Sequence, residues 1–283
     1  MKISWKIAAA AAILAVPTTL GAQSTAPAGF TSMFDGKTLK GWNGDMSVWS
    51  VQDGAITVDT STPIKANTFL VYSKQYGNFE LRFKYRWSTD VGNSGFQLRS
   101  GMAEGNFTMA GYQANVVPLG GPPERFGMLY NELVDRQEEA LLGQRVTLTR
   151  RTATNGGTAR VVRTVHEMVN SRDAILGAVH PKGEWNEVVV IAYGNRIISA
   201  INGMMAFDAV DKDPIHFENG LFGLQAHSGP AMKVQYKDIY VKPLTAMPRW
   251  EGRFKSTPTP APAPSQTYKD STRAALPDVA LPQ

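Results

Sequence analysis

The sequence has 283 residues, of which 43% are hydrophobic and 10% are aromatic, and its formal net charge is +5. This composition excludes a chain that is disordered throughout, because it supplies enough apolar side chains for a core. Lys and Arg are scattered among Asp and Glu, with no basic run beyond Arg150-Arg151, so we expect no nucleic-acid partner. The absence of cysteine excludes disulfides, thiolate metal sites and thiol nucleophiles.

The N-terminus has the layout of a secretory signal peptide. Lys2 and Lys6 are followed by an apolar run from Ile7 to Val16 and then by small residues up to Ala22. The apolar run is short for a membrane span, although an uncleaved anchor is the alternative. We therefore expect residues 1–22 to be removed, and the protein to be periplasmic or secreted with no stable membrane insertion after cleavage.

The segment from about residue 29 to residue 244 has the period of two that β-strands require. In Phe79–Trp87 the odd positions are all apolar and the even ones all charged, which predicts a strand with one buried and one solvated face. The same reading predicts further strands, with a bulge near Lys237-Asp238, and an inserted hairpin with its turn at Asn155-Gly156-Gly157. These strands are Glu187–Tyr193, Asn195–Ile201, Met204–Phe207, Lys233–Val241, and Arg145–Thr152 with Thr158–Val165 for the hairpin.

Helices are expected only as short pieces, at Val134–Leu142 and Arg172–Ala178. Many short strands separated by turn signals predict an all-β fold, an antiparallel β-sandwich. After Leu244 the sequence becomes rich in proline, above all from Ser256 to Pro264. We therefore predict that residues 245–283 form a disordered tail.

Four predicted strands each carry two polar residues at positions i and i+2, whose side chains lie on one face of a strand. The pairs are Gln97 and Arg99, Gln113 and Asn115, Tyr130 and Glu132, and Gln225 and His227. If these strands share a sheet, they form one patch of amides, a guanidinium, a carboxylate and an imidazole, which suits a carbohydrate. The alternative is the ordinary solvated face of an antiparallel sheet.

Standard catalytic signatures do not account for these residues. His166-Glu167 lacks the second histidine of a zinc-protease helix, and Gly92–Gly95 is one residue short of a nucleophile elbow. Glu132, Asp135 and Glu138 do not have the spacing of laminarinase-type glucanases.

The order of the motifs resembles the 3-keto-disaccharide hydrolase family, also described as 3-keto-glucoside 1,2-lyases/hydratases. The motifs are Phe34–Trp42, Asn93-Ser94-Gly95 with Arg99, Gly111-Tyr112-Gln113, Leu129-Tyr130 with Glu132, Gly183–Asn186, Asn202-Gly203 and Gly223–His227. The resemblance implies a concanavalin A-like jelly roll over residues 29–244. The chain departs from the family pattern at Asn115 and Asn131, where relatives often carry aspartate. It also departs from the pattern in Arg145–Gly177, which we interpret as an insertion.

The resemblance implies a glycoside whose C3 hydroxyl has been oxidised to a ketone, and cleavage by C2 proton abstraction, elimination at C1 and hydration. His227 is then the expected base, with Glu132 as its rival or orienting partner, and Arg99 the expected stabiliser of the enolate. A divalent metal ion is the alternative to Arg99 in that role. The residues expected to hold the sugar are Gln97, Tyr112, Gln113, Asn115, Tyr130 and Gln225.

Two other functions compete with this enzyme. One is a non-catalytic, lectin-like carbohydrate-binding domain that uses the same face, and the other is an adhesion domain of the laminin-G type. A binding domain would retain a glycoside without turnover, whereas the enzyme would consume the 3-keto sugar.

Overall fold

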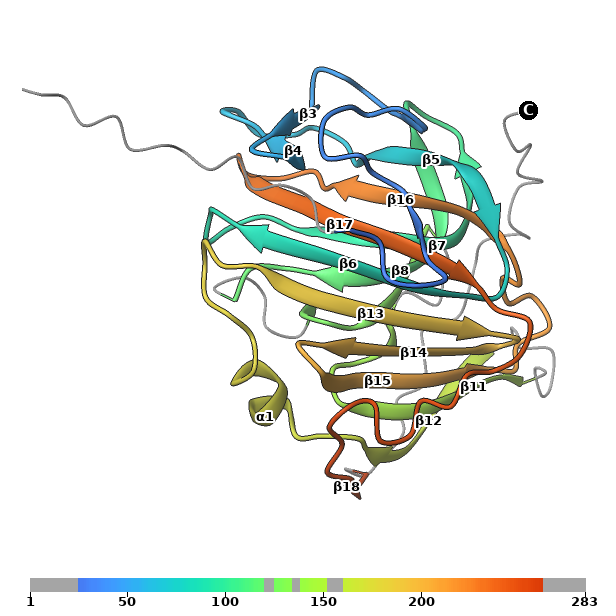
Figure 1. Ribbon diagram of the computed structural model, residues 1–283. Coiled ribbons are helices and arrows are strands. Elements are labelled where there is room, and N and C mark those ends of the chain that lie inside the picture. Colours follow the sequence, from blue (N-terminus) through green and yellow to red (C-terminus); the bar gives the residue numbers. More distant parts are fainter. Residues whose placement is uncertain (1–24, 120–124, 134–137, 152–159, 262–283) are drawn as a thin grey trace, which may run out of the picture.

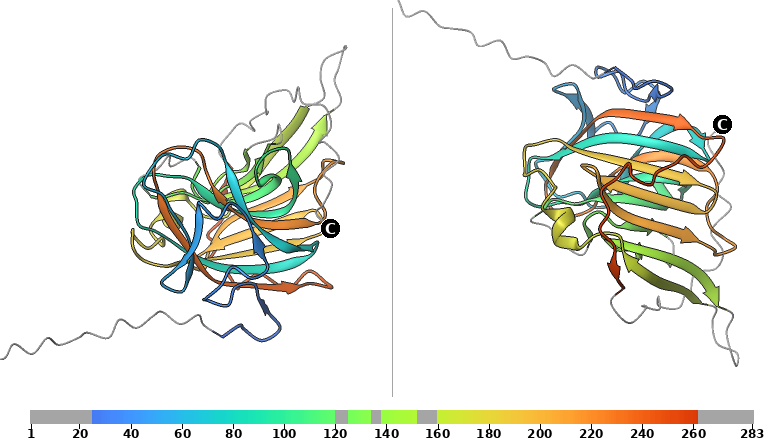
Figure 2. Two further views of the ribbon diagram at one scale, coloured as in Figure 1. Left: turned by 90° about the horizontal axis from the view of Figure 1, so that it is seen from above. Right: turned by 60° about the horizontal axis from the view of Figure 1, so that its bottom comes forward.

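The computed structural model describes residues 25–119, 125–133, 138–151 and 160–261. Within these ranges the chain forms two β-sheets that stack as layers (Figure 1; Figure 2). The predicted signal peptide and the predicted turn at Asn155-Gly156-Gly157 lie outside the described residues. In the part of the chain that is described, no helix has the length and apolar character needed to cross a membrane.

The larger sheet has eleven strands among the described residues. Ten of them follow one another across the sheet, and β1 (Thr31–Ser32) pairs with β17 at the side. In spatial order they are β18 (Thr259–Pro260), β12 (Arg160–Met168), β11 (Gln144–Arg151), β15 (Met204–Asp211), β14 (Arg196–Ile201), β13 (Asn186–Tyr193), β6 (Phe79–Trp87), β17 (Lys233–Pro243), β4 (Ala55–Asp59) and β3 (Trp49–Gln52).

The smaller sheet has seven described strands, which carry seven of the eight residues of the polar pairs, and His227 directly follows one of these strands. In spatial order they are β10 (Glu138–Ala140), β9 (Leu129–Glu132), β8 (Thr108–Val116), β7 (Ser94–Ala103), β16 (Gly220–Ala226), β5 (Thr68–Tyr76) and β2 (Trp42–Asn43).

The core lies between the two sheets. The five alternate side chains of β6 are at most 4% exposed and belong to one apolar cluster with residues of the smaller sheet; they are Phe79, Leu81, Phe83, Tyr85 and Trp87. The inward-facing, alternate side chains of each sheet pack against the other sheet, and this burial stabilises the sandwich. The predicted all-β sandwich of largely antiparallel sheets is confirmed.

The expected insertion extends the larger sheet. β11 and β12 pair antiparallel as the predicted hairpin, and β11 adds to β15 in parallel. The bulge in β17 is also confirmed, because the register shifts after Lys237 and Asp238 has a φ of 50°.

The two helix predictions have different outcomes. The helix near Arg172–Ala178 is confirmed as α1 (Arg172–Leu176), with Ser171 as its N-cap. The helix predicted at Val134–Leu142 is wrong where it is described, because Glu138–Ala140 is β10 and pairs with β9. Pairing with β9 gives backbone N–H and C=O groups of β10 hydrogen-bond partners. A short isolated helix would leave the backbone groups at its ends without such partners.

The prediction of a disordered tail is wrong for residues 245–260, which we call the C-terminal strap. Figure 1 shows this segment leaving the end of β17 and reaching β18 at the opposite side of the larger sheet. Trp250 is 9% exposed and packs with Ile191, Ile198 and Met205 on the outer face of β13, β14 and β15. The outer face of these strands is apolar, so the packing of residues 245–260 on it removes apolar surface from water and stabilises the fold. The composition of the segment alone does not reveal this contact. Residues 262–283 lie outside the described residues.

Polar contacts fasten the strap at several points. Arg253 donates to both carboxylate oxygens of Glu80, and the Arg196 guanidinium lies 4.9 Å from the centre of the Trp250 ring. The amide of Asn170 donates to the carbonyl of Lys255 over 2.9 Å. The strap is therefore part of the folded domain.

Truncating the central side chain of the strap should weaken the fold. Trp250→Ala is expected to lower the free energy of unfolding by about 1.5–3 kcal/mol, the usual contribution of one large buried side chain. Urea denaturation measures the loss, and limited proteolysis should show faster cleavage within residues 245–260. Met46→Ala is the control, because Met46 is 52% exposed. Equal stability of the two variants would contradict the packing described here.

Candidate functional site

The four polar pairs come from four neighbouring strands in the order β9, β8, β7 and β16. The backbone register places Gln113 directly opposite Gln97 on one side and Tyr130 on the other. Residues that face each other across antiparallel strands project from the same face of the sheet. These side chains therefore share the outer face of the smaller sheet, away from the core.

The outer face of the smaller sheet is strongly curled at this point. Asn67 directly precedes β5, and Glu132 ends β9, four strand spacings away. In a flat sheet those strands would be about 19 Å apart. The Asn67 Nδ2 nevertheless donates to Glu132 Oε1 over 2.9 Å. The polar face is therefore concave, and the hydrogen bond spans its mouth.

The concave face holds a pocket of about 170 Å³. Six residues predicted from the sequence line it: Gln113, Asn115, Tyr130, Glu132, Gln225 and His227. Asn67, Asn93, Arg125 and Leu133 complete the lining. The pocket therefore gathers carboxylate, imidazole, guanidinium, phenol and amide groups in a space that accepts about one ring-sized molecule, since an engineered cavity of about 150 Å³ accepts benzene.

His227 follows the end of β16, and its ring orientation is set by the backbone. Its Nδ1 lies 2.5 Å from the Ser228 carbonyl oxygen, which can only accept a hydrogen bond. We therefore assign the proton of the neutral ring to Nδ1, which leaves the lone pair on Nε2. The amide nitrogen of Ser228 donates to Asn67 Oδ1 over 2.8 Å. His227 is thus held in the tautomer that a general base needs.

Glu132 is buried and held by two amides. Asn67 Nδ2 and Gln225 Nε2 donate to its two carboxylate oxygens over 2.9 and 3.1 Å. Burial raises the pKa of Glu132, and the two amide hydrogen bonds and the charges of His227 and Arg125 oppose that rise. A carboxylate in this position can orient a hydroxyl or accept a proton.

Several buried amide atoms of the pocket have no hydrogen-bond partner among the described residues. They are Asn93 Oδ1, Gln113 Nε2, Asn115 Oδ1 and Gln225 Oε1. Buried polar atoms without partners are costly unless a ligand pairs with them. Both donor and acceptor types are present, which suits the hydroxyls of a sugar.

Gly95 allows Gln113 to take its place in the pocket. A Cβ on Gly95 would lie 2.5 Å from the Cγ of Gln113, closer than side-chain carbons approach. The Gln113 side chain therefore leans over the backbone of Gly95. Tyr130 stands on the other side, where burial and the charge of Glu132 raise the pKa of Tyr130 to about 12. Its hydroxyl stays protonated at neutral pH and can donate a hydrogen bond.

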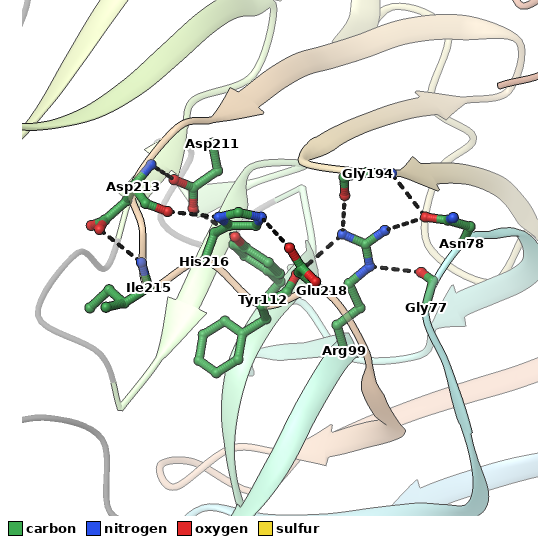
Figure 3. A network of polar contacts seen from close by, with 11 residues as sticks. Gly77, Asn78, Arg99, Tyr112, Gly194, Asp211, Asp213, Ile215, His216 and Glu218 are labelled. Carbon is green, nitrogen blue, oxygen red and sulfur yellow. Dashed lines mark hydrogen bonds and ion pairs between the residues drawn. The ribbon is translucent and has the colours of Figure 1, made fainter. Parts of the chain in front are cut away.

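Arg99 is not part of the pocket, which corrects the sequence prediction. Its guanidinium donates to the carbonyl oxygens of Gly77, Gly194 and Phe217 over 2.8, 2.6 and 3.2 Å, and to Asn78 Oδ1 over 3.3 Å. Figure 3 shows this cluster, in which Arg99 joins the loops around Gly77 and Gly194. Arg99 is 1% exposed, so it has a structural role.

A bulge in β7 is the reason for this difference. The register with β8 shifts between Leu98 and Gly101, and Arg99 has a φ of 47°. An extra residue in a strand turns the following side chains to the other face, so the i and i+2 rule fails here. Gly220 makes room for the bulge, because a Cβ there would lie 2.4 Å from the carbonyl carbon of Arg99.

Removing the Arg99 side chain should destabilise the protein and leave catalysis in the folded molecules nearly intact. In Arg99→Ala, three backbone carbonyls lose a charged donor, and the expected loss in the free energy of unfolding is about 2 kcal/mol. Urea denaturation and kcat per folded molecule separate the two effects. A large loss of kcat with unchanged stability would restore the catalytic role that the sequence suggested.

Three other residues singled out in the sequence also lie outside the pocket lining. Tyr112 faces the core side of β8 and donates to Asp211 Oδ2 over 2.6 Å, as Figure 3 shows. This corrects its assignment to the sugar, because neighbours in a strand alternate between faces. Gln97 shares the face of Gln113 but is fully buried beside the pocket. Asn131 points away from it and donates to Glu139 Oε1 over 2.7 Å.

Sequence reasoning missed four lining residues. Asn93 stands in a motif that carried the family resemblance, so a signal for it existed. Asn67, Arg125 and Leu133 stand outside the paired polar positions. The curl of the sheet brings Asn67 to Glu132, and Leu133 directly follows Glu132 in the chain.

The pocket offers a metal ion few charged ligands. Glu132 and His227 are its only side chains of the types His, Cys, Asp and Glu, and no cluster of three such residues exists in the described ranges. Both oxygens of Glu132 already accept from amides. This donor set does not fit a divalent metal site, so no step is assigned to a metal ion.

The raised pKa of Glu132 predicts a pH-dependent effect on stability. The folded protein keeps a proton on Glu132 at pH values where the unfolded chain, with a pKa near 4.5, has lost it. This contribution to stability is therefore lost as the pH rises above about 4.5 through the folded pKa.

Glu132→Gln removes that titration. The free energy of unfolding of the variant relative to wild type should rise with pH above about 4.5 and then level off. Urea denaturation at a series of pH values measures it, and Glu138→Gln serves as the control. A difference that falls as the pH rises would contradict a pKa of Glu132 that is raised by burial.

Comparisons with known proteins show the family of the chain. The model of the 3-keto-α-glucoside-1,2-lyase-like domain family matches residues 29–242. A 3-keto-disaccharide hydrolase of Bacteroides thetaiotaomicron is 23% identical over 257 residues, covering 76% of this chain and 79% of the relative.

Similar solved structures include a crystal structure described as a candidate glycosyl hydrolase from Parabacteroides distasonis, with 20% identity and a TM-score of 0.48, covering 76% of this chain and 94% of that one. A carbohydrate-binding module from Bacillus subtilis has 14% identity and a TM-score of 0.41, covering 71% of this chain and 95% of that one. The family match covers the strands from β1 to all but the last residue of β17, and it includes every lining residue of the pocket. The chain therefore belongs to the 3-keto-α-glucoside-1,2-lyase-like domain family.

Proposed function

We propose that this protein cleaves 3-keto glycosides by elimination followed by hydration, with net hydrolysis. The observation that carries the proposal is the convergence of His227, Glu132 and unpaired buried amides in one concave pocket of a domain of this family. The name of the Bacteroides relative supports the same class of substrate.

The chemistry follows from the ketone. A carbonyl at C3 makes the C2 proton acidic, so a base removes it and the electrons form an enolate on the C3 oxygen. The enolate re-forms the ketone, a C1–C2 double bond forms, and the C1–O bond breaks while the leaving oxygen takes a proton. Water then adds its oxygen to C1 and a proton to C2, which gives the free 3-keto sugar.

The lining residues can supply the groups that this reaction needs. His227 Nε2 is the base for the C2 proton, because Nδ1 is committed to the Ser228 carbonyl. Arg125 takes the role first expected of Arg99, since it is a cation that lines the pocket and its charge acts on both Glu132 and Tyr130. It would stabilise the enolate oxygen.

The remaining polar groups orient the sugar. Gln113 Nε2 and the Tyr130 hydroxyl donate hydrogen bonds, and Asn115 Oδ1 and Gln225 Oε1 accept them. Glu132 is held by Asn67 and Gln225 and accepts from a sugar hydroxyl. Elimination proceeds without an oxocarbenium ion, so the two acids of ordinary glycosidases are not needed.

The test uses one glucoside in two forms, the unoxidised sugar and its 3-keto derivative, incubated in D₂O. The expected result is that only the keto sugar is cleaved and that deuterium appears at C2 of the product, which NMR detects. Cleavage of the unoxidised glucoside, or a keto product without deuterium at C2, would overturn the elimination mechanism.

The same two glucosides distinguish the proposed enzyme from a non-catalytic carbohydrate-binding domain. A binding domain would retain the glycoside in equilibrium dialysis and leave both forms uncleaved. The proposed enzyme consumes the keto form.

A further inference from the structure

A second pocket of about 260 Å³ opens at one end of the sandwich. Its inner wall consists of Tyr85 and Trp87 at the end of β6, and the rest is largely apolar. The apolar lining residues are Val117, Pro118, Leu119, Phe126, Val179 and Pro181. The proposed reaction at the polar pocket makes no use of this space.

The two pockets are neighbours along two stretches of chain. Asn115 lines the polar pocket, and Val117, two residues further, lines the apolar one. In the same way, Arg125 lines the polar pocket, and the next residue, Phe126, lines the apolar one. Two residues of extended chain span about 7 Å, so the two pockets lie close together.

Two buried donors on residues that line the apolar pocket have no partner among the described residues. They are the Tyr85 hydroxyl and Trp87 Nε1, on side chains that are 2% and 4% exposed. The indole nitrogen can only donate. A ligand for this pocket therefore gains from an acceptor oxygen near these two atoms.

The other polar groups of the lining are already engaged. Asn186 Oδ1 accepts from the amide nitrogen of His180 and from Asn202, and Asn186 Nδ2 donates to the His180 carbonyl. The ring of His180 bonds the Trp185 carbonyl, and Lys182 pairs with Asp90 at the exposed rim. A second sugar, with hydroxyls in every direction, would find few partners here.

We infer that the apolar pocket holds the leaving group of the substrate, and that this group is an aromatic or similarly apolar ring bearing an acceptor oxygen. The inference rests on the proposed function, because it assigns the keto sugar to the polar pocket. The polar pocket has room for about one ring, so the group attached at C1 must lie elsewhere. The apolar pocket exceeds the roughly 150 Å³ that holds benzene and admits one substituted ring.

Two variants test the assignment from opposite directions. Tyr85→Phe removes an unpaired donor without changing the packing, and Val179→Phe fills part of the space. Each is assayed with a 3-keto 4-methoxyphenyl glucoside and with a 3-keto methyl glucoside. The variant-to-wild-type ratio of kcat/KM is compared between the substrates, because this ratio cancels the different leaving abilities of the two groups.

For Tyr85→Phe the ratio should fall about 2–10-fold with the aryl substrate and stay near one with the methyl substrate, as expected for one hydrogen bond. Val179→Phe should raise KM for the aryl substrate only. Tyr72→Phe is the matched control, because Tyr72 packs against Trp42 and lines neither pocket. Equal losses on both substrates, or no loss on either, would overturn the inference.

A measurement without turnover separates this inference from the proposed function. 4-Methoxyphenol should bind to the wild-type protein and quench tryptophan fluorescence, and Val179→Phe should weaken that binding. If no keto sugar is cleaved but this binding holds, the apolar pocket binds an aromatic ring, but the proposed reaction fails and with it the role of that ring as a leaving group. If keto sugars are cleaved and the phenol does not bind, the pocket assignment is wrong.

Discussion

Replacing His227 with alanine is expected to lower kcat for a 3-keto glucoside about 10²–10⁴-fold, the usual loss when a general base is removed. The fold should be unaffected, because the ring of His227 bonds only the carbonyl of the next residue, Ser228, in the described structure. Steady-state kinetics measures the loss, and circular dichroism confirms folding. The fraction of sugar bound should change much less than kcat.

His166→Ala is the matched control, because His166 contacts Thr147 in the inserted hairpin and does not line the pocket. It should retain full activity. Glu132→Gln distinguishes the two candidate bases. Complete loss in Glu132→Gln, together with residual activity in His227→Ala, would make Glu132 the base.

Phe83→Ala should have the largest effect on stability. Phe83 is fully buried, and its ring lies 4.7 Å from Phe96 of the smaller sheet and 6.1 Å from Tyr236 of the larger one. Truncation leaves a cavity where the two sheets meet, and such substitutions cost about 3–5 kcal/mol. Urea denaturation measures the change in the free energy of unfolding.

The control for this measurement is Lys74→Ala on the exposed part of β5, which should change stability by less than about 0.5 kcal/mol. A cost near zero for Phe83→Ala would mean that the faces of β6 are reversed.

Most of the strands could be predicted from the sequence because alternation is a local property. Phe79–Trp87 has a polar residue between every two apolar ones, and this pattern directs alternate side chains to opposite faces wherever the strand lies. The same logic found six of the ten lining residues, since pairs such as Gln113 and Asn115 must share a face in any regular strand.

The predictions from the sequence failed at positions whose structure depends on contacts with distant parts of the chain. Arg99 obeys the same i and i+2 spacing, but a bulge in β7, accommodated by Gly220 of a neighbouring strand, carries its side chain to backbone carbonyls elsewhere. Trp250 stands in a stretch without strand or helix pattern, and it is ordered because the outer face of the larger sheet offers it apolar contacts. Neither partner is adjacent in sequence.

The sequence by itself determined the sandwich and the chemical character of its site. It placed a histidine, a carboxylate and several amides on one face of neighbouring strands, because the periodicity of a strand needs no knowledge of its neighbours. The tertiary structure alone decided that the face is concave, since Asn67 reaches Glu132 only when the sheet curls across four strand spacings. It also places Arg125, and not Arg99, in the lining of the pocket. Curl, bulge and strap depend on contacts between residues far apart in the chain, and local patterning carries no information about those contacts.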